Sequence, residues 1–220
     1  MAGWLRRGLR GDESAEALSK RAALDSLRYV VLDTELTSLD HRTNRLLSVG
    51  AVAMQGSSIR LGEQFYRVVN PQAAIPAETV VIHKLRPEDV EGGAQLGQTL
   101  DDLCRFIDGA VLVGHFVEIE LKILRKEMSQ TGHKLDNPAI DTAKVHRWIL
   151  RHSPYSEDLP VQLDKLDLPA LASFYHLDVE DAHHALADAF LTARVWQKMV
   201  HTLREKKVTN LDKLLKIGGV

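Results

Sequence analysis

Apolar positions fall in short continuous runs over the first half of the chain, and later recur with helical spacing. The short runs predict strands at residues 28–33, 45–54, 59–69, 110–114 and 138–141. The turn QGSS between the second and third strands predicts a hairpin. Helices are predicted at residues 14–27, 78–85, 86–90, 99–107, 118–128, 142–150, 169–176, 184–203 and 211–217. An irregular loop is predicted at 153–167, which contains two prolines.

The order of these elements predicts an α/β fold with a mixed five-stranded sheet. Strands first follow one another directly and then alternate with helices, which places helices on the faces of the sheet. Ligand sites on such sheets gather at the ends of strands. Polar residues that directly follow an apolar run are therefore the first candidates for a functional site.

Composition narrows the class of protein. The chain has 220 residues and a net charge of −2, which suits one domain with appendages and argues against coating of nucleic acid by bulk charge. An enzyme that holds only the end of a strand stays possible. Cys104 is the only cysteine, which excludes an intramolecular disulfide and favours a cytoplasmic, reducing location. We expect no secretory signal and no membrane span, because no apolar run is long enough.

Two carboxylates directly follow the first predicted strand, in the stretch VVLDTELTSLD. In an extended segment residues two apart share a side, so Asp33 and Glu35 lie together and Thr34 faces away. The carboxylates repel each other unless a cation lies between them, and oxygen ligands suit Mg²⁺ or Mn²⁺. The alternative is an ordinary polar loop.

Two further acids could complete such a site. Glu120 lies near the start of a helix behind the apolar strand AVLVG, although acids are also common as solvated residues in a first helical turn. Asp188 lies among alanines in DAHHALADAF, beside two histidines that titrate near neutral pH. Helical spacing alone favours His184, four residues from Asp188, as its partner. A plain surface histidine pair is the alternative.

Taken in order, these motifs resemble the DnaQ-like DEDDh 3′–5′ exonucleases, a family that includes the epsilon subunit of DNA polymerase III, RNase T and oligoribonuclease. The resemblance rests on DTE, GHFVEIEL, IDT and HHALADA, with IHKLRPEDV as a further similar segment, and covers residues 28 to 199. It implies a ribonuclease H-like fold, with an exonuclease domain at 28–203, a helical extension at 1–27 and a tail at 204–220. It also implies two divalent cations held by four acids, with a histidine as general base.

The resemblance also assigns roles. Asp33 corresponds to the ligand that bridges the two metals, Glu35 and Asp188 to ligands on the nucleophile side, and Glu120 to the ligand of the other metal. The family's histidine stands five residues before its last aspartate, which selects His183 over His184 as the base.

The terminal base is expected to lie over the loop after the first strand. Thr34 and Leu36 are the expected contacts there. Phe116 is a stacking candidate whose alternative is core packing.

The second motif departs from the family. The usual HNxxFD reads HFVEIE, with Phe116, Ile119 and Glu120 at the changed positions. The resemblance implies a metal-dependent exonuclease acting on single-stranded 3′ ends of DNA, with a polymerase as a possible partner in proofreading. The alternatives are an exonuclease that trims RNA and a non-catalytic relative that binds a nucleic-acid end or a polymerase.

Overall fold

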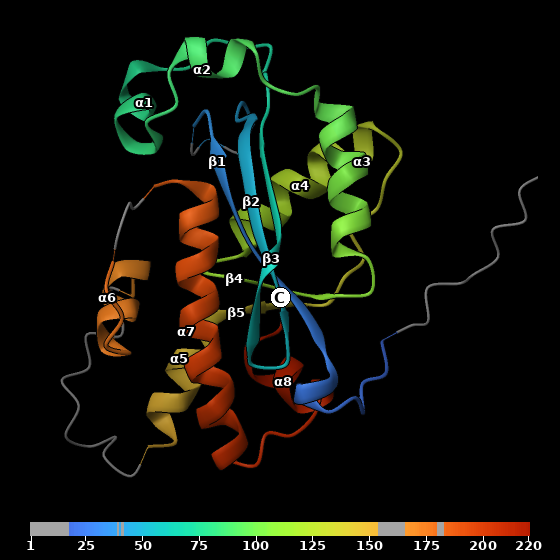
Figure 1. Cartoon of the computed structure of the whole chain (residues 1–220), viewed down its shortest axis with the longest axis vertical. Coiled ribbons are helices and arrows are strands. Elements are labelled where there is room, and N and C mark those ends of the chain that lie inside the picture. Colours follow the sequence, from blue (N-terminus) through green and yellow to red (C-terminus); the bar gives the residue numbers. More distant parts are fainter. Residues whose placement is uncertain (1–17, 39, 41, 154–165, 180–182) are drawn as a thin grey trace, which may run out of the picture.

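A five-stranded mixed sheet forms the centre of the molecule (Figure 1). The computed structural model describes residues 18–38, 40, 42–153, 166–179 and 183–220. The strands are β1 (Arg28–Leu36), β2 (Leu46–Gln55), β3 (Ser58–Val68), β4 (Val111–Gly114) and β5 (Ala139–Asp141). Their order across the sheet is β3-β2-β1-β4-β5, with β1, β4 and β5 parallel and β2 antiparallel to both of its neighbours. The predicted hairpin and the predicted five-stranded sheet are confirmed.

Helices cover both faces of the sheet. Those of the described chain are α1 (Ala77–His83), α2 (Pro87–Glu91), α3 (Leu96–Ile107), α4 (Glu118–Gln130), α5 (Thr142–Arg151), α6 (Leu168–Phe174), α7 (Ala185–Glu205) and α8 (Leu211–Gly218). The apolar core on one face joins the sheet to α5, α6, α7 and α8, and the core on the other face joins it to α3 and α4. The helices α1 and α2 lie beyond one end of the sheet (Figure 1).

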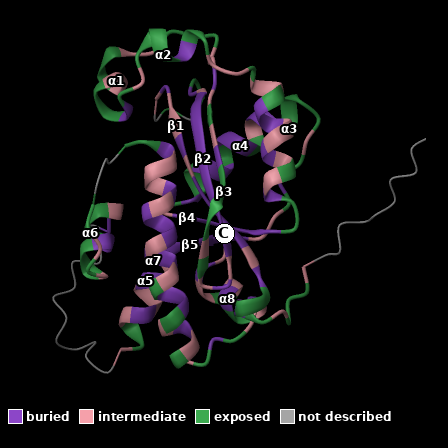
Figure 2. Cartoon of the chain, viewed as in Figure 1, coloured by how far each residue is buried: buried purple, intermediate pink, exposed green. Residues whose placement is uncertain are grey.

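The alternation of side chains along β1 decides which core each residue enters. Tyr29 and Val31 belong to the core under α7, whereas Val30 and Leu32 belong to the core under α4. All four are buried, as are most residues of β1, β2 and β4 (Figure 2). Because side chains alternate with a period of two, Asp33 continues the row of Tyr29 and Val31 and lies on the side of α7.

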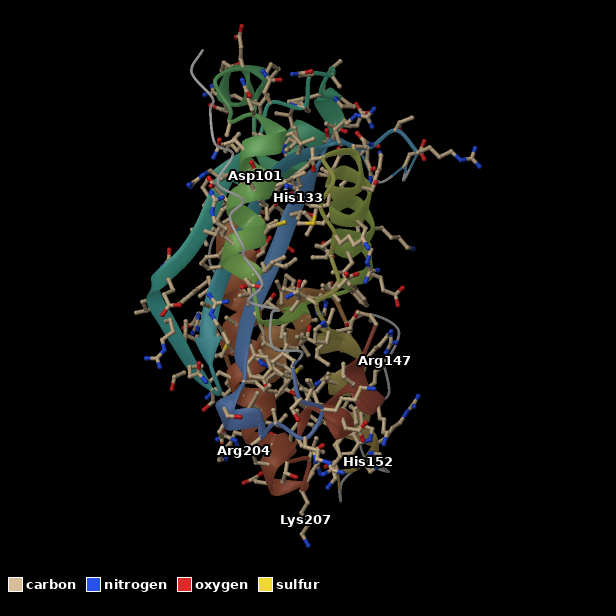
Figure 3. The ribbon with its side chains drawn as sticks, turned by 90° about the vertical axis from the view of Figure 1, so that its right-hand side faces the viewer. Asp101, His133, Arg147, His152, Arg204 and Lys207 are labelled. Carbon is tan, nitrogen blue, oxygen red and sulfur yellow. The ribbon has the colours of Figure 1, made fainter. Side chains whose placement is uncertain are left out.

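Contacts between segments distant in sequence hold the helices and the last residues of the chain in place. The His133 ring lies 2.6 Å from Oδ1 of Asp101, so the chain after α4 is held against α3 (Figure 3). At the other end of the chain, Gly219 forms a bridge with Ile140 of β5. Leu211 and Leu214 of α8 are buried in the α7-side core. The last residues therefore pack into the domain, and the predicted boundary at residue 204 stays a prediction.

The predicted helix at 14–27 is wrong over its described part. Residues 18–27 contain only a 3₁₀ turn at Leu24–Ser26, and residues 14–17 lie outside the described chain. The N–H of Leu24 donates to the carbonyl of Thr209, and the segment is drawn against the start of α8. Leu24 and Leu27 are both buried. In this segment, tertiary hydrogen bonds and burial therefore outweigh the helical spacing of the apolar residues.

The remaining predicted elements agree with the structure to within a few residues at their ends. The predicted loop at 153–167 lies mostly outside the described residues. Among the helices that the structure describes, none is both long and apolar enough to cross a bilayer.

Candidate active site

Three carboxylates meet where β1 ends. Asp33 and Glu35 lie on β1 and Asp188 lies in the first turn of α7, with their nearest oxygens all within 4.8 Å of one another. The two β1 residues share a side of the strand, as the sequence predicts, and that side faces α7. A strand end and a helix start thus bring together residues that are more than 150 positions apart in sequence.

Gly50 of β2 permits this approach. It pairs with Asp33 in the β1–β2 ladder. A Cβ at this position would lie 2.3 Å from the backbone nitrogen of Leu186 and 2.4 Å from the carbonyl carbon of Ala185. The backbone of α7 therefore rests directly on β2 beside Asp33. We did not predict this role, although a glycine inside the apolar run LLSVGAVAM is the usual sign of a close backbone approach.

Glu120 brings the fourth carboxylate from the opposite side. It lies in the first turn of α4, is only 8% exposed, and its Oε2 has no hydrogen-bond partner among the described residues. Burial, with a contribution from the charges of Asp141 and Glu35, raises the pKa of Glu120 to about 8. An unpaired carboxylate in such a place costs free energy unless it binds a cation or a proton.

The electrostatics of Asp33 show that the four acids form one cluster. Its pKa is raised well above the usual value, first by burial and then by the negative charges of Glu120, Glu35 and Asp188. Burial and the charge of Asp188 raise the pKa of Glu35 to about 7. Mutually repelling carboxylates with an unpartnered buried oxygen are a donor set that fits divalent cations. The predicted ligands Asp33, Glu35, Glu120 and Asp188 are therefore brought together.

The two histidines before α7 have different surroundings. The backbone N–H of His183 donates to Oδ2 of Asp188 at 2.9 Å, and the residue has a left-handed φ of 69°. His184 is the N-cap of α7, where its Nδ1 accepts from the N–H of Ala187, and its ring stacks on Tyr66. Within the described chain, the ring of His183 has no hydrogen bond, so it is free to act on a neighbouring group.

The pKa of Asp188 reflects both histidines. Burial raises it above its usual value, while the N–H of His183 and the positive charge of the two imidazoles act in the opposite direction. Since both imidazoles influence this carboxylate, both lie beside the acid cluster.

A pocket of about 240 Å³ opens beside the acids, between the end of β1 and α1. Its lining includes Thr34, Glu35, Leu36, Ser38, Thr79, Ile82, His83, Ile119 and Glu120. The segment IHKLRPEDV thus forms one wall, through Ile82 and His83. Thr34 and Leu36 line this pocket, whereas Phe116 lines a neighbouring cavity and is 40% exposed. Core packing of Phe116, the alternative interpretation, is therefore wrong.

Asp141 is a residue of the site that our sequence interpretation left without a role. It ends β5, pairs with Gly114 of β4 and accepts hydrogen bonds from the N–H groups of Ala143 and Lys144 as the N-cap of α5. Its charge raises the pKa of Glu120, so it lies close behind the cluster. The motif IDT was the available signal, since an Asp between a strand and a helix is a typical cap.

Comparison with known protein families shows to which family this chain belongs. Residues 30–196 match the RNase T family, described as exonuclease. The chain belongs to the RNase T exonuclease family. All four acids and both histidines of the site lie inside the matched residues, and the family predicted from the ordered motifs is confirmed.

Curated relatives of this chain include bacterial proteins named as DNA polymerase III or as its subunit epsilon. The chain is 31% identical over 183 residues to the DNA polymerase III subunit epsilon of Rickettsia conorii, covering 80% of this chain and 75% of the relative. It is 28% identical to the subunit epsilon of Aquifex aeolicus, covering 86% and 89% of the two chains. It is 27% identical to the PolC-type DNA polymerase III of Thermotoga maritima, but covers only 14% of that much longer protein.

Solved exonucleases share the fold. Exonuclease I of E. coli in complex with a dT13 oligonucleotide superposes with a TM-score of 0.71 at 15% identity, covering 83% of this chain and 43% of that one. Exonuclease X in complex with 5′ overhanging duplex DNA gives a TM-score of 0.61 at 18% identity and covers 87% and 98%. The predicted ribonuclease H-like fold is confirmed.

Proposed function

We propose that this member of the RNase T family is a metal-dependent 3′–5′ exonuclease that releases nucleoside monophosphates from single-stranded 3′ ends of DNA. The observation that carries the proposal is the meeting of Asp33, Glu35, Asp188 and the buried, unpartnered Glu120 at the end of β1. Such a cluster destabilises the folded chain unless cations bind to it, and hydrolysis of a phosphodiester needs cations at that place.

The four acids would hold two divalent cations, Mg²⁺ or Mn²⁺. In the roles that the resemblance assigns, Asp33 would be a ligand of both cations, Glu35 and Asp188 would hold the one on the side of the attacking water, and Glu120 would hold the one on the side of the leaving group. When bound, the cations supply positive charge that lowers the pKa of water and stabilises the phosphate oxygens.

His183 is the general base in this proposal. Its backbone N–H donates to Asp188 and its ring has no hydrogen bond in the described chain, in contrast to His184, whose ring caps α7 and stacks on Tyr66. His183 removes a proton from water, and the water oxygen forms a bond to phosphorus. The bond from phosphorus to the 3′ oxygen of the preceding nucleotide breaks, and that oxygen takes a proton from solvent.

The pocket beside the acids holds the terminal nucleoside. Leu36 and Ile82 offer apolar contact to the base, and Thr34 has a buried hydroxyl without a partner among the described residues. Apolar contact does not distinguish the bases, which suits an enzyme that removes any nucleotide. A volume of about 240 Å³ is near the lower limit for a small-molecule site, and so it suits one nucleoside.

The test is release of label from oligonucleotides with Mg²⁺ or Mn²⁺. A 3′-labelled single strand should yield labelled mononucleotide at once, and a 5′-labelled strand should shorten one nucleotide at a time. DNA and RNA strands of one sequence are compared in parallel. Faster hydrolysis of RNA would replace the proposed substrate, and binding without hydrolysis under either metal would indicate a non-catalytic relative.

A replicative DNA polymerase is the proposed partner. The support is the similarity, over most of their length, to proteins named DNA polymerase III subunit epsilon. Co-elution of the purified chain with the replicative polymerase of the same organism tests this, and separate elution at micromolar concentrations of both would refute it.

A further inference from the structure

A cavity of about 340 Å³ lies on the side of the sheet that α3 and α4 cover (Figure 1). We name it the Glu127 cavity. It is bounded by the start of β2, the segment after β3, the start of α3 and the last turn of α4, and its lining includes Arg45, Leu46, Val69, Leu96, Glu127 and Gln130. None of the four acids of the cluster is among the described lining residues, so the cavity is separate from the candidate active site.

Glu127 is a buried acid that the fold leaves without a partner. It is only 2% exposed, and its Oε1 has no hydrogen bond with any residue that the structure describes. A carboxylate removed from water in this way costs free energy unless a donor reaches it. Because Glu127 lines a cavity, a bound molecule that carries hydrogen-bond donors can satisfy it.

Arg45 adds hydrogen-bond donors to the same lining. Its Nη1 donates to the carbonyl of Asn44, and it forms no ion pair with an acid of the described chain, Glu127 included. A guanidinium group has five N–H donors, so most of them stay available to a ligand. The two charged side chains therefore line one cavity without satisfying each other. A matching ligand has donors for Glu127 and acceptors for Arg45.

Apolar side chains form much of the remaining lining. Leu46 and Val69 are buried and Leu96 is partly buried, and all three belong to the core under α4. Apolar walls with a few placed polar groups are the usual construction of a small-molecule site, and such sites begin at about 300 Å³. The volume of the Glu127 cavity therefore suits a compact ring rather than a large cofactor.

We propose that the Glu127 cavity binds the guanine base of a free nucleotide. The N1–H and the amino group of guanine are adjacent donors, and the two oxygens of a carboxylate accept both. Its O6 and N7 are acceptors that an arginine contacts with two donors. The faces of the ring contact Leu46 and Leu96, as bases held in protein pockets contact apolar side chains. The site goes beyond the proposed exonuclease activity and does not depend on it.

Other ligands match the lining less well. A metal cation would meet one carboxylate and the positive charge of Arg45 among the described lining residues. A free amino acid would bring two charges out of water, which costs more than burial of a neutral ring. Cytosine and adenine each offer a carboxylate one amino group and no adjacent N–H.

The first experiment is calorimetric titration of the wild type with guanosine, inosine, adenosine and cytidine in EDTA. Nucleosides carry no phosphate and EDTA removes divalent cations, so binding at the acid cluster is avoided. We expect guanosine to bind at one site per chain. Inosine lacks only the amino group and should bind about 10- to 150-fold more weakly, the range for one hydrogen bond to a charged group. Wild type that does not bind guanosine, or that binds all four nucleosides equally, would overturn the proposal.

The second experiment repeats the guanosine titration with two charge-matched variants. Glu127→Gln keeps the shape of the side chain, but an amide offers one acceptor oxygen where the base needs two, so affinity should fall at least about tenfold. Glu91→Gln removes the same charge at an exposed position on α2 and should change affinity no more than about twofold. Equal affinities of the two variants would overturn the assignment of Glu127. Exonuclease activity is not needed for either outcome, so the proposed function is tested separately.

A third variant and three further ligands complete the test. Leu96→Trp fills the cavity while Glu127 and Arg45 stay in place, so it should abolish guanosine binding even if Glu127→Gln proves unstable. Melting temperatures in EDTA show that each variant is folded, and binding kept by folded Leu96→Trp would overturn the cavity as the site. Ca²⁺, free arginine and the single strand dT3-dG-dT3 are titrated in the same way. Binding of any of these through Glu127, without binding of guanosine, would replace the proposed ligand.

Discussion

Gly50 on β2 pairs with Asp33 on β1. Because Gly50 has no side chain, the backbone of α7 packs directly against the sheet at this position. The contact sets the distance between Asp33 and Asp188, because the first turn of α7 is held at Leu186 directly against this glycine. The geometry of the acid cluster thus depends on a residue that has no chemistry of its own.

Gly50→Ala should therefore damage both stability and activity. Its methyl group would overlap backbone atoms, which cannot turn aside as a side chain can, so α7 must shift away from β2. We expect a loss of about 1–3 kcal/mol in the free energy of unfolding and at least a tenfold loss of exonuclease rate. Gly62→Ala is the matched control on β3, since a Cβ there meets nothing within 4 Å. Denaturant unfolding and rate measurements that do not separate the two variants would contradict the assigned role of Gly50.

The stability of the metal-free protein should fall as the pH rises from about 4.5 to 8. Glu35 and Glu120 have pKa values of about 7 and about 8 in the folded chain and an ordinary value of 4.5. Over this interval the folded state holds more protons than the unfolded state, so each rise in pH favours unfolding. We expect a fall of several degrees in the melting temperature, at about 2–4 °C for each 1 kcal/mol.

Glu120→Gln should flatten this dependence, because it removes one of the titrating groups. The melting temperature is followed in EDTA by differential scanning fluorimetry. A wild type whose melting temperature is constant across the interval would show that the acids are not strained in the metal-free fold.

Mn²⁺ should raise the melting temperature of the wild type in proportion to its occupancy. Binding to the folded state alone stabilises by about 2.7 kcal/mol at a concentration of 100 Kd. Asp33→Asn should remove most of this gain and nearly all exonuclease activity while the fold is kept, and Glu35→Ala and Asp188→Ala should act likewise. Asp108→Asn, which alters an exposed acid at the end of α3, should respond to Mn²⁺ as the wild type does. Equal responses of the Asp33 and Asp108 variants would exclude the cluster as the metal site.

Variants of the two histidines should differ in the dependence of their exonuclease rates on pH. His183→Ala should lower the rate by about 10²–10⁴-fold and remove the acid limb, because the base is lost. His184→Ala should keep the limb and destabilise the protein by about 0.5–2 kcal/mol, since it removes the cap of α7. The reverse pattern would assign the base to His184 and would mean that its stacking on Tyr66 is broken in the active form.

Glu120→Asp should lower the rate with Mg²⁺. Glu120 lies in the first turn of α4, and its negative charge acts directly on Asp33, so the longer side chain reaches the cluster. The shorter side chain would withdraw the carboxylate from the cluster, and Mg²⁺ tolerates a misplaced ligand poorly. Initial rates with Mg²⁺ and Mn²⁺ measure the effect. A rate above that of the wild type would instead identify Glu120 as a weakened ligand.

Much of the fold was predictable from local patterns. Continuous apolar runs gave β1, β2 and β4, because strands buried on both faces need apolar residues at every position. The alternation along β1 also predicted that Asp33 and Glu35 share a side. The prediction was wrong at 18–27, where hydrogen bonds to Thr209 and burial of Leu24 outweigh the helical spacing.

The acids of the site were predictable because the sequence shows their residue types and their order. It also shows the strand end that places the first two acids. Only the tertiary structure decided how they meet. The approach of α7 depends on Gly50, the different surroundings of His183 and His184 depend on a left-handed φ and on Tyr66, and the exposure of Phe116 depends on the turn before α4. The approach of α7 to β2 and the stacking of His184 on Tyr66 are contacts between segments distant in sequence. The left-handed φ values of His183 and Phe116 are backbone angles that no pattern of apolar and polar residues contains.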